Sequence, residues 1–348
     1  MAQQIILSTS ICDELTALCD TKADKLFVLT DTTTHEKCLP LLSGCEALKE
    51  AVHIVIGATD THKTLDTLAY VWQQLGHGGG SRHSLMVCLG GGMVTDLGGF
   101  AASTFKRGIR FINIPTTLLA MVDAAVGGKT GINFGGLKNE IGVFNESQAV
   151  VINTQFLQTL DAENIRSGYA EMLKHALLSG GDLLARHLDF DLANPDLPRL
   201  QKMVAESIKV KEAIVKADPH EHGLRKALNL GHTFGHALES LALEQDRAVL
   251  HGYAVAWGLV CELYLSCTLR QFPESVMRQC VRFIRDYYGT FDFDCKVYDH
   301  LYDLMRHDKK NQAGVINFTL LNGVGDIALD CHATQNDVYE AFDFLREA

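Results

Sequence analysis

The chain has 348 residues, of which 47% are hydrophobic and 21% charged, and its formal net charge is −11. This length exceeds what one hydrophobic core usually fills, so we expect two domains in a globular protein that is not disordered. The acidic balance, with no basic run interleaved with aromatics, excludes a duplex-binding protein, so we expect no nucleic-acid partner. An anionic substrate would need positive charges that are gathered locally.

Export and membrane insertion are not indicated. The N-terminal segment has no basic region and no A-x-A site. The most apolar long stretch, Val249–Leu265, contains His251 and Glu262, which favours a buried helix over a membrane span. The ten cysteines include no C-x-x-C pair. We therefore expect free buried thiols in a cytoplasmic protein with no membrane partner.

The first half alternates short apolar runs with amphipathic segments. Strands are expected at Lys25–Thr30, Val52–Ile56, Ser84–Leu89, Arg110–Ile114 and Ala149–Ile152, with a helix at Thr64–Leu75. Alternation of this kind predicts a parallel sheet with crossover helices. Residues 1–157 are thus expected to form an α/β parallel-sheet domain.

The second half changes character. Helices are expected at Asn164–Ser179, Leu200–Ala217, Ala227–Ala242, Gly252–Arg270 and Glu274–Tyr288, and a strand pair at Val315–Leu321 and Asp326–Leu329. Since several of these helices follow one another without a strand between them, residues 158–348 are expected to form a mainly α-helical domain.

A glycine-rich run, LGGGMVTDLGGF (Leu89–Phe100), follows a predicted strand and opens a predicted helix. Its glycines permit close approach of a pyrophosphate to free backbone N–H groups, although the run is not G-x-G-x-x-G. Asp31, Thr116 and Thr117 follow other strand ends, where ligands of open α/β sheets bind. Each of these features could instead be a helix cap or a turn.

A second glycine-rich stretch, Val126–Gly142, carries Lys129 and Lys138. Glycine and lysine together can close over a phosphorylated or acidic ligand. The alternative is a solvated loop with ordinary surface lysines.

Segment GHTFGH places His232 and His236 one helical turn apart, and His251 follows at the start of the next helix. Neutral imidazoles at this spacing suit a divalent metal, and Glu171, in an otherwise apolar helix, could add a carboxylate. On chemistry alone His236 is as good a ligand as His232. Arg225 and Asn229 precede the pair at spacings of three or four, which predicts one shared polar helix face.

Taken together, these segments resemble the 3-dehydroquinate synthase family over nearly the whole chain. The resemblance rests on LGGGMVTDLGGF, RGIRFINIPTTLLAMVDAAVGGKTGIN, LKNEIGVF, SGYAEMLKHALL, LRKALNLGHTFGHALE, HGYAVAWG and HDKKNQAGVINFTLL. It implies a homodimeric carbon–oxygen lyase that uses NAD and one divalent metal, Zn or Co.

The resemblance also implies roles for individual residues. The metal ligands would be Glu171, His232 and His251. Catalytic positions would be Lys63, Lys174, Arg225, Asn229 and His236. Substrate contacts would come from Lys129, Lys138, Asn139, Lys211, Lys309 and Lys310, and from Arg107 across the dimer interface. NAD contacts would come from Asp31, Asp60, Lys63, Gly92, Met93, Val94, Thr95, Asp96, Thr116, Thr117, Lys129, Lys138, Phe156, Leu157, Gln158 and Thr159. Thr33 and Thr95 stand where relatives often carry asparagine and glycine.

The implied reaction converts the sugar phosphate 3-deoxy-D-arabino-heptulosonate 7-phosphate into 3-dehydroquinate and phosphate, a step toward aromatic amino acids. It proceeds by transient oxidation with NAD, β-elimination of phosphate, re-reduction and intramolecular aldol closure. Three alternatives remain: another sugar-phosphate cyclase, a polyol dehydrogenase that releases NADH, and a regulator that kept the fold. The Asp308-Lys309-Lys310 run, with Arg225 and Asn229, favours a substrate that bears a carboxylate.

Overall fold

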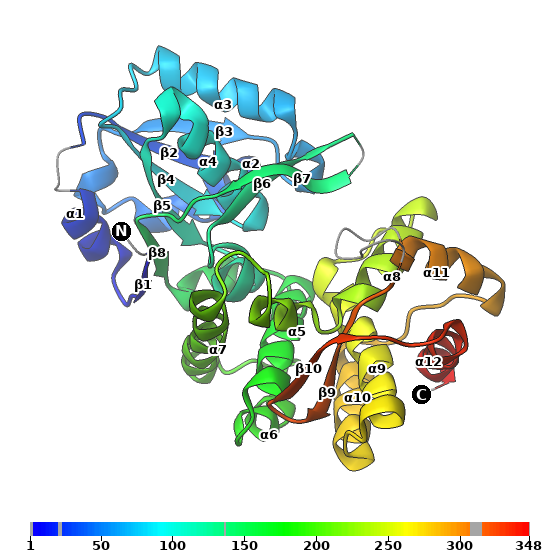
Figure 1. Cartoon of the computed structure of the whole chain (residues 1–348). Helices are drawn as coiled ribbons and strands as arrows, with labels where there is room; N and C mark the ends of the chain where they lie inside the picture. The colour runs from blue at the N-terminus through cyan, green and yellow to red at the C-terminus, as the bar shows by residue number, and fades with distance from the viewer. Residues whose placement is uncertain (1–2, 20–22, 136, 307–314, 348) are drawn as a thin grey trace. The chain divides into compact units, whose positions relative to one another are not determined.

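The protein is described by a computed structural model covering residues 3–19, 23–135, 137–306 and 315–347. The chain divides into two compact units, Met1–Asp161 and Ala162–Ala348 (Figure 1). The first is built on a parallel sheet and the second is mainly helical, which confirms the predicted fold class.

The first unit contains a six-stranded sheet in which every pairing is parallel. Its order is β1(Gln4–Leu7), β8(Ala149–Ile152), β5(Arg110–Pro115), β4(Leu85–Gly90), β2(Leu26–Asp31), β3(Val52–Ile56). The five predicted strands are present, and β1 was not predicted. All six residues of β4 are buried, as expected for a central strand that is covered on both faces.

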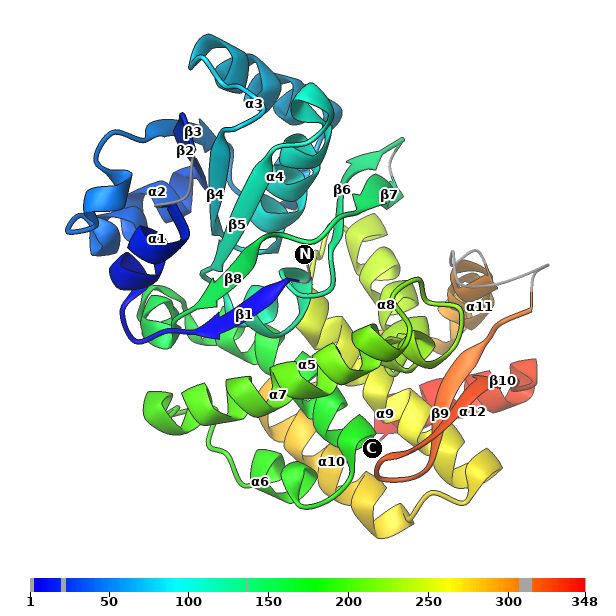
Figure 2. The same cartoon turned by 60° about the vertical axis from the view of Figure 1, so that its left-hand side comes forward.

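Helices α1(Ile11–Cys19), α2(Thr32–Lys37), α3(Leu65–His77) and α4(Gly92–Thr104) connect these strands (Figure 2). Alternate residues of the strands, such as Phe27, Leu29, Met86 and Cys88, join side chains of α3 and α4 in one buried cluster. These two helices therefore cover the same face of the sheet. Short helical turns complete the unit at Leu39–Leu42, Glu46–Leu48, Asp60–His62, Phe105–Arg107, Ala120–Ala124 and Thr154–Thr159.

The stretch Val126–Gly142 is not a solvated loop. It forms most of an antiparallel hairpin, β6(Lys129–Phe134) and β7(Leu137–Phe144). Gly131 and Gly142 face each other across the ladder, where an added Cβ on Gly142 would lie 2.1 Å from the Thr130 carbonyl oxygen. The glycines that suggested a loop thus permit close pairing of two strands.

The expectation that all ten cysteines are free thiols was wrong for one pair. Cys12, on α1, and Cys45, at the start of the Glu46–Leu48 turn, form a disulfide across 33 positions of sequence. Neither C-x-x-C spacing nor any other local pattern marks this pair, because the fold brings the two residues together. Cys38, Cys88, Cys261 and Cys280 are free and buried, as predicted.

The second unit consists mainly of helices, with one hairpin. They are α5(Ala162–Ser179), α6(Leu183–Leu188), α7(Leu197–Ala217), α8(His232–Glu244), α9(His251–Arg270), α10(Glu274–Tyr288), α11(Tyr298–Arg306) and α12(Gln335–Glu347), with β9(Phe318–Gly323) pairing β10(Asp326–Cys331). Short 3₁₀ turns lie at Leu224–Asn229 and Cys295–Val297.

Helix α9 is the central helix of this unit. It is long and apolar enough to span a membrane, but 72% of its apolar window is buried inside the protein, as in the core helix of a globular domain. Two glycines of α9, Gly252 and Gly258, and one of α8, Gly235, let the backbones approach one another. An added Cβ would lie 1.8 Å from the Ser167 carbonyl oxygen at Gly252, 1.9 Å from the Gly231 carbonyl oxygen at Gly258, and 2.9 Å from the Ala254 carbonyl oxygen at Gly235. Helices α5, α8 and α9 are therefore held at fixed, close spacing.

The predicted helix Ala227–Ala242 is interrupted. Arg225 and Asn229 lie in the 3₁₀ turn Leu224–Asn229, and the chain turns at Leu230 and Gly231 before α8 begins at His232. Gly231 has φ +83°, a conformation that suits glycine, so one continuous helix is not formed. The expected single polar face from Arg225 to His236 was therefore wrong.

Candidate functional site

Three helices of the second unit bring Glu171, His232 and His251 together. His232 and His251 are the first residues of α8 and α9, and Glu171 lies in the middle of α5. The Oε1 atom of Glu171 is 3.3 Å from Nε2 of His232 and 3.8 Å from Nε2 of His251. A carboxylate and two imidazole nitrogens converging in this way form a donor set that suits Zn²⁺ or Co²⁺.

The protonation pattern of this cluster is compatible with a cation. Glu171 is completely buried, and burial alone would raise its pKa; the Lys174 ammonium, in ion-pair contact, and the two imidazoles outweigh burial, so its pKa lies well below the usual range. The Nδ1 atom of His232 lies 3.2 Å from the Leu230 carbonyl oxygen. Because a carbonyl can only accept, Nδ1 carries a proton, and Nε2, which faces Glu171, is the nitrogen that a metal would use.

His236 also belongs to this neighbourhood. Its imidazole and those of His232 and His251 each offer a nitrogen within 4.8 Å of the others. Its ring centroid lies 5.4 Å from that of His232 and 5.9 Å from that of His251. Geometry alone therefore allows His236 either to bind a cation or to exchange protons beside one.

Cationic and amide side chains from the same unit occupy buried or half-buried positions. Lys174, 1% exposed, donates from Nζ to the Leu228 carbonyl oxygen at 2.8 Å. Asn229 donates to Glu221 at 3.1 Å. Arg225, 3% exposed, donates from Nη1 to the Pro219 carbonyl oxygen at 2.6 Å.

Asp218, which the sequence did not single out, shapes the turn that carries Arg225. Its carboxylate accepts the backbone N–H groups of His222, Gly223 and Arg225. The N–H groups of Gly223, then of His222 and Arg225, lower the pKa of Asp218 to about 2, so it stays charged in the neutral range. Lys211 is buried on α7, and Lys309 and Lys310 lie outside the described residues.

In the first unit, the glycine-rich run lies at the carboxyl edge of the sheet. Strand β4 ends at Gly90, and α4 begins at Gly92 with no side-chain cap on its N-terminus. A Cβ on Gly90 would lie 2.5 Å from Val94, so this glycine is also required by packing. Thr95 is buried and donates its hydroxyl to the Gly92 carbonyl oxygen at 3.0 Å, within the first turn of α4. Met93 lies within this turn, and Asp96 directly follows Thr95 in α4.

Asp31 and Thr117 have structural roles at the same edge. Asp31 ends β2 and caps α2, accepting the Thr34 N–H at 2.7 Å, while its own N–H binds the Thr34 hydroxyl. Thr33 is exposed and stands outside this capping box. Thr116 donates its N–H to the Gly90 carbonyl oxygen at 3.0 Å, and the Thr117 hydroxyl accepts the Ala120 N–H at 3.1 Å.

The segment Phe156–Thr159 lies within a 3₁₀ turn that follows β8. Phe156 and Leu157 are buried core side chains, whereas Gln158 is exposed. Any ligand contact from Phe156 and Leu157 would thus come from the backbone. The Thr159 hydroxyl donates to the Phe156 carbonyl oxygen at 2.7 Å.

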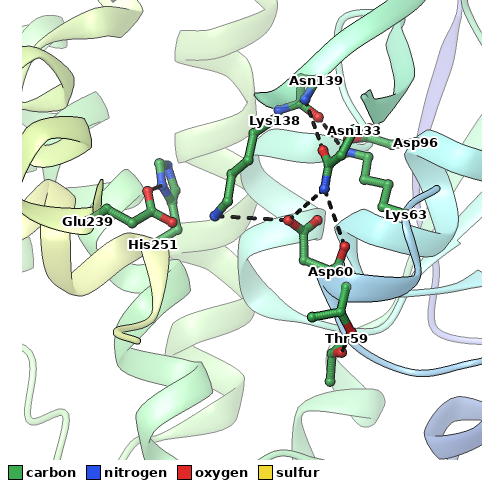
Figure 3. A network of polar contacts seen from close by, with 10 residues as sticks. Thr59, Asp60, Lys63, Asp96, Asn133, Lys138, Asn139, Glu239 and His251 are labelled. Carbon is green, nitrogen blue, oxygen red and sulfur yellow. Dashed lines mark hydrogen bonds and ion pairs between the residues drawn. The ribbon is translucent and has the colours of Figure 1, made fainter. Parts of the chain in front are cut away.

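A polar network joins Lys63 to the β6–β7 hairpin (Figure 3). The ammonium of Lys63, 3% exposed, binds Asp96 at 2.5 Å and also the Asn139 side chain. Burial raises the pKa of Asp96, and Lys63 opposes this rise. Asn133, not predicted from sequence, accepts the Asn139 N–H at 2.9 Å and donates to Asp60 at 3.1 Å.

Other predicted substrate residues lie on exposed parts of the first unit. Lys138 forms a 3.9 Å ion pair with Asp60 (Figure 3), and Lys129 is exposed at the start of β6. Arg107 is exposed beside Lys106, and both have positive φ, of +71° and +49°. Two successive non-glycine residues in this conformation make the backbone strained at this turn.

Two family models match the chain. The model described as 3-dehydroquinate synthase N-terminal covers residues 53–167, and the model described as 3-dehydroquinate synthase C-terminal covers residues 168–311. A 3-dehydroquinate synthase of Parabacteroides distasonis is 52% identical over 347 residues, covering 99% of this chain and 98% of the relative. A 3-dehydroquinate synthase of Corynebacterium diphtheriae is 37% identical and covers 93% of this chain and 90% of the relative.

Solved structures share the architecture. The 2-epi-5-epi-valiolone synthase of Streptomyces hygroscopicus, solved with NAD⁺ and Zn²⁺ bound, has a TM-score of 0.85 at 25% identity and covers 100% of this chain and 97% of its own. A 2-deoxy-scyllo-inosose synthase, solved with carbaglucose-6-phosphate, NAD⁺ and Co²⁺, has a TM-score of 0.82 at 22% identity and covers 99% of this chain and 96% of its own.

Proposed function

This chain belongs to the 3-dehydroquinate synthase family, and we propose that it converts 3-deoxy-D-arabino-heptulosonate 7-phosphate into 3-dehydroquinate and inorganic phosphate. The observation that carries the proposal is the convergence of Glu171, His232 and His251 from three helices. Such a donor set suits a cation that holds vicinal hydroxyls of a sugar. The chain is thus a carbon–oxygen lyase that acts on a sugar phosphate.

NAD and one divalent metal, Zn or Co, are the proposed cofactors. The metal, when bound, polarises substrate hydroxyls, and NAD, when bound, supplies transient oxidation at one carbon of the sugar. The first unit is proposed to bind the dinucleotide, with the uncapped N-terminus of α4 facing the pyrophosphate. Asp31, Asp60, Thr116 and the other carboxyl-edge residues named above supply further contacts.

The substrate is acidic at two places, a carboxylate and a phosphate. Cationic and amide side chains are proposed to bind these two groups. They are Lys63, Lys129, Lys138 and Asn139 of the first unit, Lys174, Lys211, Arg225 and Asn229 of the second, and Lys309 and Lys310. Partly buried cations cost desolvation energy, and an anionic ligand offsets it. These cations would gather positive charge at the substrate site, although the chain as a whole is negatively charged.

His236 is proposed to accept the proton of a substrate hydroxyl, directly or through water. It lies beside His232 and His251, and an imidazole nitrogen can accept a proton and give it up again. Lys174 keeps Glu171 ionised, so that this carboxylate remains available as a ligand.

We further propose a homodimer in the cytoplasm, in which Arg107 reaches the phosphate end of the substrate bound by the partner subunit. The exposure of Arg107 on the first unit and its strained backbone support such a role. In this proposal, residues 1–157 form the nucleotide-binding domain and residues 158–348 form the catalytic domain.

The test is an incubation of the whole protein with the heptulosonate phosphate, NAD and Zn²⁺ or Co²⁺. Release of inorganic phosphate together with formation of 3-dehydroquinate is the expected result. Sugar phosphates without a carboxylate, the substrates of an inosose or valiolone synthase, serve as the comparison. Turnover of these compounds alone would overturn the proposed substrate while leaving the cyclase chemistry intact.

A further inference from the structure

Helices α8 and α9 each carry a glutamate that binds at the start of the other helix, beside a candidate metal ligand. Glu239 of α8 accepts from Nδ1 of His251, the first residue of α9, at 3.1 Å (Figure 3). In the opposite direction, Glu262 of α9 accepts the N–H groups of Gly231 at 2.6 Å and Thr233 at 3.1 Å. These two amides flank His232 at the start of α8.

Glu262 is a costly residue to bury, because it is completely inaccessible within an otherwise apolar helix. Its two oxygens bind different amides, so the carboxylate holds the backbone on both sides of His232. Gly231 completes this anchor: a Cβ there would lie 2.9 Å from the Leu259 side chain and 3.0 Å from the Val255 carbonyl oxygen. The backbone of His232 thus has little freedom to shift.

Glu239 acts on the side chain of the other histidine. A carboxylate accepts, so His251 carries a proton on Nδ1, and its Nε2, which faces Glu171, is the nitrogen left for a metal. The hydrogen bond also fixes the rotation of the imidazole ring. A carboxylate partner of this kind makes a histidine a more basic ligand.

We propose that Glu239 and Glu262 are positioning residues for a divalent cation held by His251 and His232, each supplied by the helix that carries the other histidine. The inference rests on the proposed metal site. Neither residue contacts the substrate in this account; both act through the histidines. We call the pair the reciprocal brace. Loss of either carboxylate should weaken metal binding by about 10- to 100-fold.

The brace predicts an order among variants. Glu239→Ala removes the acceptor, whereas Glu239→Gln keeps a neutral one, so metal affinity should fall from wild type to Gln to Ala. Glu262→Gln keeps the volume and one acceptor while removing the buried charge. Glu244, also on α8, pairs with Nε2 of His300 at 2.6 Å in an exposed position, so Glu244→Ala and Glu244→Gln are matched controls.

Affinity for Co²⁺ is measured on the metal-free full-length protein by competition with a chelator, together with the visible absorption of bound Co²⁺ and the thermal stability without metal. Weaker binding and an altered Co²⁺ spectrum in the Glu239 and Glu262 variants, with unchanged Glu244 controls, would support the brace. Equal affinity and spectrum in Glu239→Ala and wild type would overturn it, even where Glu262→Gln fails to fold.

A His232→Ala variant separates this inference from the proposed site. If His232→Ala loses Co²⁺ while the brace variants bind normally, the brace is wrong and the metal site stands. If His232→Ala binds Co²⁺ as tightly as wild type, the metal site itself is wrong. A purely structural role for Glu262 would lower the stability of the metal-free protein without changing the Co²⁺ spectrum.

Discussion

Glu171 and His232 lie on different helices, yet a carboxylate oxygen of the one is 3.3 Å from Nε2 of the other. This relationship requires α5 and α8 to be fixed against α9, which the glycines at their contacts achieve. The Lys174 ammonium keeps this buried carboxylate ionised, and the close approach of its oxygen to an imidazole nitrogen gives the cluster two converging donors for a cation.

Replacement of the histidines should separate ligands from the proton acceptor. His232→Ala and His251→Ala should lose bound metal and activity together, because each removes a donor. His236→Ala should retain metal while kcat falls by about 10²- to 10⁴-fold, the usual contribution of one acid–base group. Metal content by elemental analysis, measured beside kcat, checks this. Loss of metal in His236→Ala would make His236 a ligand.

Lys63→Met should destabilise the first unit. It leaves Asp96, whose side chain is only 18% exposed, without its ammonium partner. We expect a loss of about 1–3 kcal/mol in the free energy of unfolding, and weaker NAD binding. Lys49→Met is the control, because its ion pair with Glu46 is exposed and should contribute less than about 1 kcal/mol. Equal urea midpoints for the two variants would contradict the role of Lys63.

Gly258→Ala should disrupt the contact between α9 and α8. The added Cβ would lie 1.9 Å from the Gly231 carbonyl oxygen, and a backbone atom cannot rotate away as a side chain can. We expect the free energy of unfolding to fall by about 3 kcal/mol or more, which is at the upper end of the usual cost of overpacking. Gly76→Ala, in α3 with no atom within 4 Å of its Cβ, should be neutral or stabilising by up to about 1 kcal/mol. Thermal denaturation of both variants measures the contrast.

Acid should destabilise the second unit through His187. Burial, aided by Arg186 and Arg199, lowers the pKa of His187 to about 3. The unfolded chain therefore binds a proton near the ordinary pKa of about 6.5 while the folded protein does not, so stability falls as the pH decreases from about 6.5 to 3. Between these two pH values, His187 alone should change the free energy of unfolding by up to about 1.4 kcal/mol per pH unit.

His187→Phe isolates that contribution. Phenylalanine keeps a ring beside Tyr169 and cannot take up a proton. Urea unfolding between pH 6.5 and pH 4 should show a shallower decline for the variant than for wild type. Parallel declines would mean that His187 is already protonated in the folded protein.

The sequence predicted the parts of the molecule whose pattern is local. Continuous apolar runs marked β2, β3, β4, β5 and β8, and the polar Glu171, His232 and His251 stood out in apolar helices. The β6–β7 hairpin was missed because its exposed strand and paired glycines look like a loop.

Pairwise relationships across the fold could not be predicted. Glu239 follows His232 by seven positions, and Glu262 follows His251 by eleven. These spacings place each glutamate near the same helix face as the histidine on its own helix. Each glutamate nevertheless binds at the other helix. The Cys12–Cys45 disulfide and the Lys63 network likewise depend on how distant segments pack. Arg225 and Asn229 were assigned to the wrong local structure because Gly231 can adopt a positive φ that ends the turn.

The most direct test of the proposed function is complete conversion of the heptulosonate phosphate by the metal-loaded enzyme with far less NAD than substrate. We expect one phosphate and one 3-dehydroquinate for each substrate consumed, with no lasting rise in NADH absorbance. A reaction that stops when NAD is exhausted, with one NADH formed for each substrate consumed, would contradict it and identify a dehydrogenase.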